Sequence, residues 1–297
     1  MLLKHLTKLY RSVQFISIIP ISTKQRSVLE DLVVNFYHSH FQVINQTSLE
    51  NKMSLSIENK TALVTGANRG IGKAIVESFL KHGAKKVYLA VRNPESTTEL
   101  SQKYGDKVVT LQVDISNAES IKALAEHAKD VDVVVNNAGV LEIADTLSSH
   151  VEAALTKELN INVFGLIRVA QAFAPILEAN GGGALVQLNS VASIKNFTGF
   201  STYSASKAAA YSLTQNLRDE LAPKGIAVLS VHPGPIATDM GTKAGFEVAE
   251  STSSVSEGIV ASLKAGDFHL FPDTVAKQFE GAYQSYADAI INADLSE

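Results

Sequence analysis

The sequence of 297 residues contains no cysteine, and this absence excludes several kinds of site. Without cysteine there can be no disulfide framework, no thiolate nucleophile and no metal held by thiolates. The eight histidines are scattered, and no pair of them has metal-ligand spacing beside an acidic residue. We therefore expect no metal site.

Long hydrophobic runs and a strong net charge are also lacking. The longest apolar run near the start, VQFISIIPIS, is interrupted by Pro20 and is too short to span a bilayer. The net charge is −4, with 45% hydrophobic and 19% charged residues, which is typical of a soluble globular protein. This composition gives no reason to expect nucleic acid or a membrane as a partner.

Acidic residues are missing from the first 29 residues, which contain five Lys or Arg. This composition is typical of a mitochondrial or plastid presequence. Alternatively, the segment is disordered or the product of a spurious upstream start, because MSLSIENKTALVTG from Met53 would begin a compact domain by itself. We treat residues 1–53 as a leader and 54–297 as a single domain. The expected location is cytoplasmic, or mitochondrial if the leader is a genuine presequence.

From residue 60 onward, short apolar runs alternate with helical patterns. Continuous runs rich in Val, Leu and Ile are typical of strands that are buried on both faces of a parallel sheet. They occur at 61–66, 86–91, 107–114, 131–139, 183–190 and 226–234, with a further candidate strand at 268–273. Helical patterns occur in IGKAIVESFLKHGA at 71–84, where Gly83 is the stop, and at 96–104, 117–129, 149–178 and 202–221. This order predicts an α/β Rossmann fold: a doubly wound, mostly parallel, seven-stranded sheet with helices on both faces.

A glycine-rich turn, TGANRGIG at 65–72, joins the first strand to the first helix. Gly66, Gly70 and Gly72 would permit a tight turn, a close backbone approach to a diphosphate and close packing of helix on strand. The helix N-terminus would supply amide donors and the positive end of its dipole. Many glycine-rich turns are merely turns, and the spacing is GxxxGxG instead of the commoner GxGxxG. The position between strand and helix favours a dinucleotide site.

Two later strand ends carry residues that suit a nucleotide. Asp114 follows VTLQV and could accept a hydrogen bond from an adenine amino group, although it could instead be the N-cap of the next helix. Asn137, Ala138 and Gly139 follow the fourth strand, where a ribose would lie, although a turn of small residues is also only a turn. Taken in order with the glycine loop, these strand ends predict a nucleotide crevice.

The end of the second strand bears on the choice between NAD and NADP. It carries Arg92, with no acidic residue until Glu95, and Arg69 lies inside the glycine loop. Two guanidinium groups would favour a 2′-phosphate through charge-assisted hydrogen bonds. The alternatives are two solvated surface arginines and an NAD-dependent enzyme of the same fold. We expect NADP(H) to be preferred over NAD(H).

A candidate reaction centre lies at the end of one strand and on two helices further along the chain. Tyr203 precedes Lys207 by four residues in GFSTYSASKAAAYSL, so both would lie on one face of a helix. Ser190 ends the fifth strand, and Asn162 lies in the helix that follows the fourth. Each residue alone has an ordinary structural interpretation. The Ser190 hydroxyl could hydrogen-bond a backbone group at the strand end, and the Asn162 side chain could hydrogen-bond a neighbouring residue. Occurring together, they favour a catalytic set.

With these motifs the sequence resembles the short-chain dehydrogenase/reductase family in its compact, single-domain form. The resemblance covers residues 57–240 and includes TGxxxGxG, Asp114, NNAG at 136–139, the four residues just described and HPGPIATDM at 232–240. It implies a carbonyl–alcohol oxidoreductase such as a carbonyl reductase, with a ketone, aldehyde or secondary alcohol as substrate. It implies a catalytic tetrad of Asn162, Ser190, Tyr203 and Lys207. The implied cofactor contacts are Gly66, Asn68, Arg69, Gly70, Ile71, Gly72, Arg92, Asp114, Ile115, Asn137, Ala138, Gly139, Tyr203, Lys207, Pro233, Gly234, Ile236 and Thr238.

The resemblance also implies a role for each member of the tetrad. Tyr203 would exchange a proton with the substrate oxygen, and Ser190 would hydrogen-bond that oxygen. Lys207 would hold the nicotinamide ribose and, together with the positive nicotinamide, lower the pKa of Tyr203 from its reference value near 10. Asn162 would bind a water that links Lys207 to solvent. His232 has no evident partner, and we interpret it as structural.

The sequence after Met240 departs from the family. Residues 239–256 are expected to form a mobile lid over the substrate. The chain then has FHLFPD and an amphipathic helix around 274–291, where many relatives have a glycine-rich strand that braces an oligomer. A homodimer through the helices at 149–178 and 202–221 is therefore expected instead of a tetramer. The expected substrate pocket is apolar and aromatic, with Leu141, Phe197, Phe200 and Phe246.

Two other functions fit the same fold. An epimerase or dehydratase acting on a nucleotide sugar would usually need a larger C-terminal domain than the residues after Met240 supply. A non-catalytic nucleotide sensor predicts that a tetrad member is lost, and none is lost.

Overall fold

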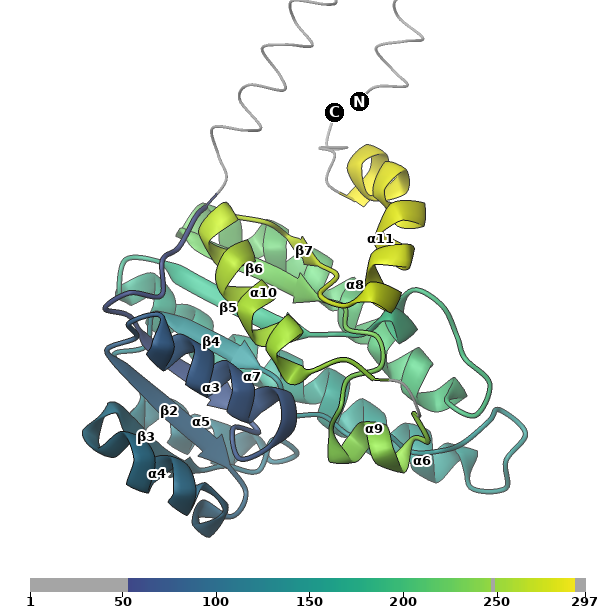
Figure 1. Cartoon of the computed structure of the whole chain (residues 1–297), viewed down its shortest axis with the longest axis horizontal. Helices are drawn as coiled ribbons and strands as arrows, with labels where there is room; N and C mark the ends of the chain where they lie inside the picture. Colours follow the sequence, from purple (N-terminus) through teal and green to yellow (C-terminus); the bar gives the residue numbers. More distant parts are fainter. Residues whose placement is uncertain (1–52, 247–248, 292–297) are drawn as a thin grey trace, which may run out of the picture. The chain divides into compact units, whose positions relative to one another are not determined.

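Seven parallel strands form one sheet in the computed structural model, which describes residues 53–246 and 249–291. The strands lie in the order β3-β2-β1-β4-β5-β6-β7, and each neighbouring pair is parallel (Figure 1). The predicted doubly wound, seven-stranded sheet is therefore confirmed. Its strands are β1 (Thr61–Thr65), β2 (Lys86–Val91), β3 (Val108–Gln112), β4 (Val133–Asn136), β5 (Gly183–Leu188), β6 (Ile226–Val231) and β7 (His269–Leu270).

Helices cover both faces of this sheet, because successive strand residues point in opposite directions. On β1, Ala62 and Val64 belong to one hydrophobic cluster, and Leu63 between them belongs to the other. The first cluster is completed by α3 and α10, and the second by α5 and α7. The α-helices are α3 (Gly70–Lys81), α4 (Thr98–Tyr104), α5 (Ala118–His127), α6 (Val151–Glu158), α7 (Phe164–Ala179), α8 (Ser201–Leu221), α9 (Asp239–Lys243), α10 (Thr252–Ala265) and α11 (Thr274–Tyr286).

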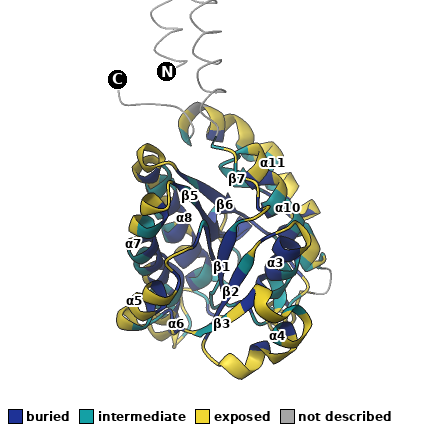
Figure 2. Cartoon of the chain, turned by 90° about the vertical axis from the view of Figure 1, so that its left-hand side faces the viewer, coloured by how far each residue is buried: buried dark blue, intermediate teal, exposed yellow. Residues whose placement is uncertain are grey.

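Burial explains why the strand sequences show so little polar alternation. All residues of β1 and β4 are buried, and Figure 2 shows the central strands in dark blue between helices whose outer faces are exposed. Apolar side chains are required on both faces of such a strand. The helices need only one apolar face, and the other remains polar.

The strand order reverses between β1 and β4, and this reversal positions the site. The chain leaves β1 toward β2 and β3, and it returns to the other side of β1 as β4. The loops after β1 and β4 consequently diverge and leave a crevice at the carboxyl edge of the sheet. The glycine loop and the NNAG turn are the two loops that border this crevice.

The long helix expected at 149–178 is interrupted. A π-helical turn, η3 (Leu159–Val163), separates α6 from α7. By length and composition alone, the helical stretch Val151–Ala179 could cross a membrane. A single stretch of this kind is weak evidence, because the core helix of a soluble fold has the same composition. Here Val169, Phe173 and Leu177 pack into the cluster on one face of the sheet.

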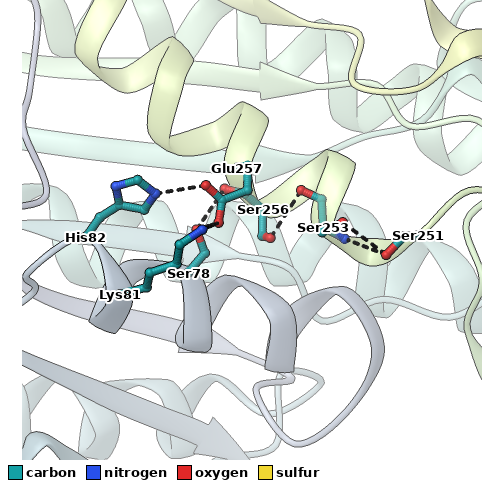
Figure 3. A network of polar contacts seen from close by, with 7 residues as sticks. All are labelled: Ser78, Lys81, His82, Ser251, Ser253, Ser256 and Glu257. Atoms are coloured by element: carbon teal, nitrogen blue, oxygen red, sulfur yellow. Dashed lines mark hydrogen bonds and ion pairs between the residues drawn. The ribbon is translucent and has the colours of Figure 1, made fainter.

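Helix α10 was not predicted from the sequence, and it begins inside the segment expected to form a lid. Residues 252–256 of the expected lid are the first residues of α10, which Ser251 caps at its N-terminus. Glu257 of α10 binds Ser78 and Lys81 of α3 and also His82, the C-cap residue of α3 (Figure 3). These contacts tie α10 to α3. The rest of the expected lid segment contains α9, and residues 247–248 lie outside the described residues.

The C-terminal elements agree broadly with the sequence pattern. The candidate strand at 268–273 reduces to the two residues of β7, which pair with β6. The helix expected at 274–291 is α11 followed by the π-helical turn η6 (Ala287–Ile291). The sheet belongs to a compact unit, Met53–Gly281, and residues from Ala282 onward belong to another. The expected leader lies outside the described residues except for Met53.

Candidate active site

A cavity of about 940 Å³ lies at the carboxyl edge of the sheet. It is lined by residues from the ends of β1, β2, β3, β4, β5 and β6 and from the start of α8. Of the residues predicted for the site, all but Asn162 line it: Gly66, Asn68, Arg69, Gly70, Ile71, Gly72, Arg92, Asp114, Ile115, Asn137, Ala138, Gly139, Ser190, Tyr203, Lys207, Pro233, Gly234, Ile236 and Thr238.

The glycine loop has a geometry that other residues would not allow. Gly66 and Gly70 have φ of 66° and 53°, in the left-handed region that favours glycine. A Cβ atom on Gly72 would lie 2.1 Å from the Gly66 carbonyl oxygen. The loop therefore brings the N-terminus of α3 directly to the cavity wall.

The first turn of α3 fits an anionic group. Its N-cap, Arg69, makes no capping hydrogen bond with its side chain, and the first turn contains no acidic residue. The amide groups of this turn consequently retain unsatisfied donors and the positive end of the helix dipole. Such an end suits the diphosphate of a dinucleotide.

The NNAG turn is joined to the glycine loop by side-chain hydrogen bonds. Asn137 Nδ2 donates to the Thr65 carbonyl at 2.8 Å, and the Thr65 hydroxyl accepts from the amides of Asn137 and Ala138, both at 2.9 Å. The side chain and backbone of Asn137 therefore join the NNAG turn to the glycine loop, which are the two walls of the crevice. Asn137, Ala138 and Gly139 all line the cavity.

Asp114 lies two residues beyond the end of β3, at the cavity rim. Its Oδ1 accepts hydrogen bonds from the amide and hydroxyl of Ser116 at 2.9 and 2.7 Å, and these bonds, with Arg92 nearby, lower the pKa of Asp114. The alternative interpretation as an N-cap is wrong, because Asn117 caps α5 by accepting from Ser120 N. An ionised acceptor is thus available at the expected adenine end.

The two arginines predicted near the 2′ position differ in their contacts. Arg92 lies directly after β2 and is exposed at the cavity rim. Arg69 forms a 2.6 Å ion pair with Asp239 at the start of α9, and both side chains are more than 60% exposed (66% and 72%). This pair bridges the glycine loop and α9 across the cavity, so Arg69 is already engaged by a carboxylate.

Ser190, Tyr203 and Lys207 converge on the inner wall of the cavity. Ser190 Oγ accepts from Ala192 N at 3.1 Å and donates to Pro233 O at the long distance of 3.3 Å. Lys207 Nζ lies 5.7 Å from the centre of the Tyr203 ring and donates to Leu188 O at 2.7 Å. A substrate oxygen at this wall could meet two hydroxyl donors at once.

The pKa of Tyr203 departs from the expectation. Burial raises it to about 12, although the nearby Ser190 hydroxyl acts in the opposite direction. Burial also lowers the pKa of Lys207 to about 8, because a desolvated ammonium group is less stable than the neutral amine. The chain's own residues therefore do not produce the lowered tyrosine pKa that we expected, and Tyr203 is fully protonated at neutral pH.

Asn162 lies behind the cavity wall, in the π-helical turn η3. Its Oδ1 accepts from Val140 N at 2.9 Å, and its Nδ2 donates to Val140 O and Ser206 Oγ, both at 3.0 Å. A Cβ atom on Gly139 would lie 3.1 Å from Asn162 Oδ1 and 3.8 Å from Lys207 Nζ. Asn162 thus fixes the loop after β4 against α8, close to Lys207.

The turn after β6 is held by a residue that the sequence analysis missed. Asp273, at 2% exposure, accepts from Gly234 N at 2.7 Å and from Ala276 N at 2.9 Å. An Asp directly before a helical pattern indicates a cap, but nothing in the sequence indicates the contact with Gly234. Thr238 lines the cavity, and its hydroxyl caps α9 by accepting from Gly241 N at 3.1 Å.

His232 has partners, contrary to the sequence analysis. Its Nδ1 lies 2.9 Å from Ser193 Oγ and 3.2 Å from Ser190 O, and its Nε2 lies 2.7 Å from Ser230 Oγ. Burial lowers the pKa of this imidazole to about 3. His232 does not line the cavity, so it is not placed to act as a base on a substrate.

The outer part of the cavity is apolar. All four residues expected there line it, and Phe200 packs edge-on against Phe246 with ring centres 6.1 Å apart. The others are Leu141, which is buried, and Phe197, whose ring lies 6.2 Å from that of Phe279. A substrate with an apolar body would fit this end.

Comparisons with known proteins agree with this geometry. The family model for short chain dehydrogenases matches residues 60–247. An uncharacterized oxidoreductase of Staphylococcus epidermidis is 33% identical over 213 residues, which cover 70% of this chain and 92% of that protein. An NAD-dependent glycerol dehydrogenase of Listeria innocua is 35% identical over 228 residues, covering 74% and 85% of the two chains.

Solved structures show the same relationship. A short chain dehydrogenase from Burkholderia cenocepacia, in complex with NADP, superposes with a TM-score of 0.73 and 33% identity, covering 80% of this chain and 97% of that one. A short-chain dehydrogenase from Streptomyces avermitilis gives a TM-score of 0.70 with 28% identity, covering 79% and 95%. The chain therefore belongs to the short-chain dehydrogenase/reductase family, whose members are NAD(P)-dependent oxidoreductases that act on CH–OH or C=O groups.

Proposed function

We propose that this protein is an NADP(H)-dependent oxidoreductase that interconverts a carbonyl and an alcohol, with Tyr203 as the general acid and base. The observation that carries the proposal is the convergence of Ser190, Tyr203 and Lys207 on the wall of a cavity that also contains the glycine loop. The residues present fit a dinucleotide, because the first turn of α3 retains free amide donors. When bound, that dinucleotide supplies or accepts the hydride.

In the reduction direction, negative charge develops on the substrate oxygen as its carbon receives hydride. Ser190 donates a hydrogen bond to that oxygen, and its weak 3.3 Å bond to Pro233 O is given up at little cost. Tyr203 donates its proton to the same oxygen. Because burial keeps its pKa near 12, the phenol is protonated and ready to donate at neutral pH.

Lys207 and Asn162 restore the proton on Tyr203. Lys207 is held by Leu188 O at 2.7 Å and lies beside the tyrosine ring. With a pKa of about 8 it can lose and regain a proton near neutral pH. Asn162 fixes the adjoining loop and lies near Lys207, where a water bound to it would link the amine to solvent. In the oxidation direction Lys207, together with the positive charge that an oxidised nicotinamide would supply, would lower the pKa of Tyr203.

NADP(H) is the proposed cofactor. Arg92 at the end of β2 and Arg69 in the glycine loop both line the cavity, and no carboxylate follows β2 until Glu95. An exposed ion pair contributes only about 0–1 kcal/mol, so a phosphate can take Arg69 from Asp239. An NAD-dependent alcohol dehydrogenase is the alternative, which the similarity to the Listeria innocua enzyme favours.

A panel of ketones and aldehydes, assayed by the loss of NADPH absorbance, tests this function. The panel should pair apolar substrates with polar ones of the same length, because the outer cavity is aromatic. We expect turnover of medium-sized apolar carbonyls and a higher kcat/KM with NADPH than with NADH. Tight NADPH binding without turnover of any substrate would favour a nucleotide sensor, and a higher kcat/KM with NADH would favour the alternative.

We also propose a homodimer through α7 and α8. Phe164 at the start of α7 is 49% exposed, and Arg168 one turn later lies 5.7 Å from its ring centre. A surface aromatic with an arginine beside it is a typical interface anchor. Light scattering after size exclusion should give the mass of a dimer for the wild type and of a monomer for Phe164→Glu. A wild-type monomer or tetramer would contradict the proposal.

A further inference from the structure

His232 lies at the end of β6, immediately before the turn that contains Pro233. The residue is fully buried, with an exposed fraction of 0%. Its ring stacks on Phe271 with centres 5.0 Å apart and meets Tyr211 edge-on at 4.6 Å. These aromatic side chains fix the plane of the imidazole, so its two nitrogens point in fixed directions.

The hydrogen bonds on one side of the ring determine which nitrogen carries the proton. Ser193 Oγ donates its only proton to Ser190 O at 2.5 Å. His232 Nδ1 lies 2.9 Å from Ser193 Oγ and 3.2 Å from Ser190 O. Because a carbonyl oxygen can only accept and the Ser193 proton is already used, Nδ1 must be the donor to both.

The other side of the ring is consistent with this assignment. In a neutral imidazole with its proton on Nδ1, Nε2 accepts, and Ser230 Oγ donates to it at 2.7 Å. Ser230 Oγ in turn accepts from Asn189 Nδ2 at 2.9 Å. The donors thus run in one direction from Asn189 through Ser230 and His232 to the Ser190 carbonyl. Burial lowers the pKa of His232 to about 3, which keeps the imidazole neutral.

This chain ends on the residue that carries the proposed oxyanion donor. The Ser190 carbonyl accepts from His232 Nδ1 and also from the amide and hydroxyl of Ser193. The Ser190 hydroxyl is oriented by Ala192 N, in the same short turn, η4 (Val191–Ser193). Fixing the carbonyl fixes this turn and therefore the direction in which Ser190 Oγ faces Tyr203.

We propose that His232 is a positioning residue, which, as the Nδ1–H tautomer, holds the Ser190 turn in the orientation that hydride transfer requires. This inference rests on the proposed function of Ser190, and His232 itself touches neither substrate nor cofactor. A displaced donor loses transition-state stabilisation but leaves the dinucleotide contacts intact. The role therefore predicts an effect on kcat and not on the KM for NADPH.

Two substitutions separate positioning from mere packing. In His232→Asn the side-chain amide can still donate toward Ser190 O, whereas His232→Leu fills the space without a donor. We expect His232→Leu to lower kcat by about 10- to 100-fold with an unchanged KM for NADPH, and His232→Asn to recover most of that loss. Equal kcat values for a folded His232→Leu protein and the wild type would overturn the proposal.

The tautomer can be measured without any turnover. Nitrogen-15 NMR of histidine-labelled wild-type protein should show His232 as the neutral Nδ1–H form at pH 5, with its resonance assigned by its loss in His232→Asn. A proton on Nε2, or a charged ring at that pH, would overturn the proposal even if the enzyme is active. If no carbonyl is reduced, the proposed function fails, and the NMR result still decides the hydrogen bonding.

If His232→Leu does not fold, Ser193→Ala provides the kinetic test. We expect a lower kcat and an unchanged KM for NADPH, and a wild-type kcat would overturn the proposal.

Discussion

The buried carboxylate of Asp273 accepts a 2.7 Å hydrogen bond from the amide of Gly234. Its second oxygen caps α11 by accepting from Ala276 N at 2.9 Å. A Cβ atom on Gly234 would lie 2.7 Å from Asp273 Oδ1, so the Asp273 side chain packs too closely against Gly234 for a side chain at that position. The segment after β7, which lies beyond the residues 60–247 that the family model matches, thus supports the turn on which the proposed nicotinamide contacts lie.

Asp273→Asn should weaken this support. An amide group has one acceptor oxygen, so either Gly234 N or Ala276 N would face an NH2 group. We expect the free energy of unfolding to fall by about 1–3 kcal/mol and the KM for NADPH to rise. Urea unfolding and steady-state kinetics measure the two effects. Asp106→Asn, at an exposed position, is the control and should change neither. An unchanged KM in Asp273→Asn would show that the turn does not need this contact.

Gly72→Ala should prevent nucleotide binding. The added Cβ would lie 2.1 Å from the Gly66 carbonyl oxygen, so the loop must move away from α3. Isothermal titration with NADPH should detect no binding, and the protein should lose stability. Gly281→Ala in α11 is a matched control, because a Cβ there meets nothing within 4 Å. Binding by Gly72→Ala with wild-type affinity would contradict the proposed diphosphate site.

Asp239→Asn should release Arg69. The ion pair across the cavity is exposed, and its loss alone affects stability little. If Arg69 binds the 2′-phosphate, we expect the Kd for NADPH to fall by up to about fivefold while the Kd for NADH stays constant. Arg92→Ala should have the opposite effect: it should raise the Kd for NADPH while the Kd for NADH stays constant. An equal change for both cofactors in either variant would argue against 2′-phosphate recognition.

Glu257 should make stability depend on pH. Its contacts with His82, Lys81 and Ser78 lower its pKa from 4.5 to about 2 (Figure 3). A depressed carboxyl pKa stabilises the folded state above the unfolded pKa, and this contribution is lost as pH falls from 4.5 toward 2.

Comparing the wild type with Glu257→Gln measures this contribution. Because the side chain is 41% exposed, we expect the wild type to be more stable by only about 1 kcal/mol at pH 7, with the difference shrinking below pH 4. Urea unfolding at a series of pH values provides the data. A difference that stays constant from pH 7 to pH 3 would exclude titration of Glu257 as its cause.

The sheet could be predicted because burial on both faces leaves a clear mark on the sequence. Runs such as Val133–Asn136 are apolar at almost every position, and each lies where the pattern places a strand. The helix α10 could not be recognised in the same way. Its first turns are rich in Ser and Thr, which have low helix propensity, and packing against α3 stabilises it instead.

The site residues were identifiable where they belong to local motifs. The cavity lining includes the glycine loop, the NNAG turn, Tyr203 and Lys207. The contacts that orient these residues come from distant parts of the chain. Ser193 meets His232 only because β5 and β6 are neighbours, and the raised pKa of Tyr203 depends on burial in the folded protein. Spacing in a sequence carries no signal for either.

Turnover by Tyr203→Phe tests the central claim most directly. The substitution removes one hydroxyl from the cavity wall and keeps the ring that lies beside Lys207. We predict that kcat for carbonyl reduction falls by at least about 100-fold, while the Kd for NADPH stays within about twofold of the wild type. Turnover near the wild-type value, with cofactor binding preserved, would contradict the assignment of Tyr203 as the proton donor.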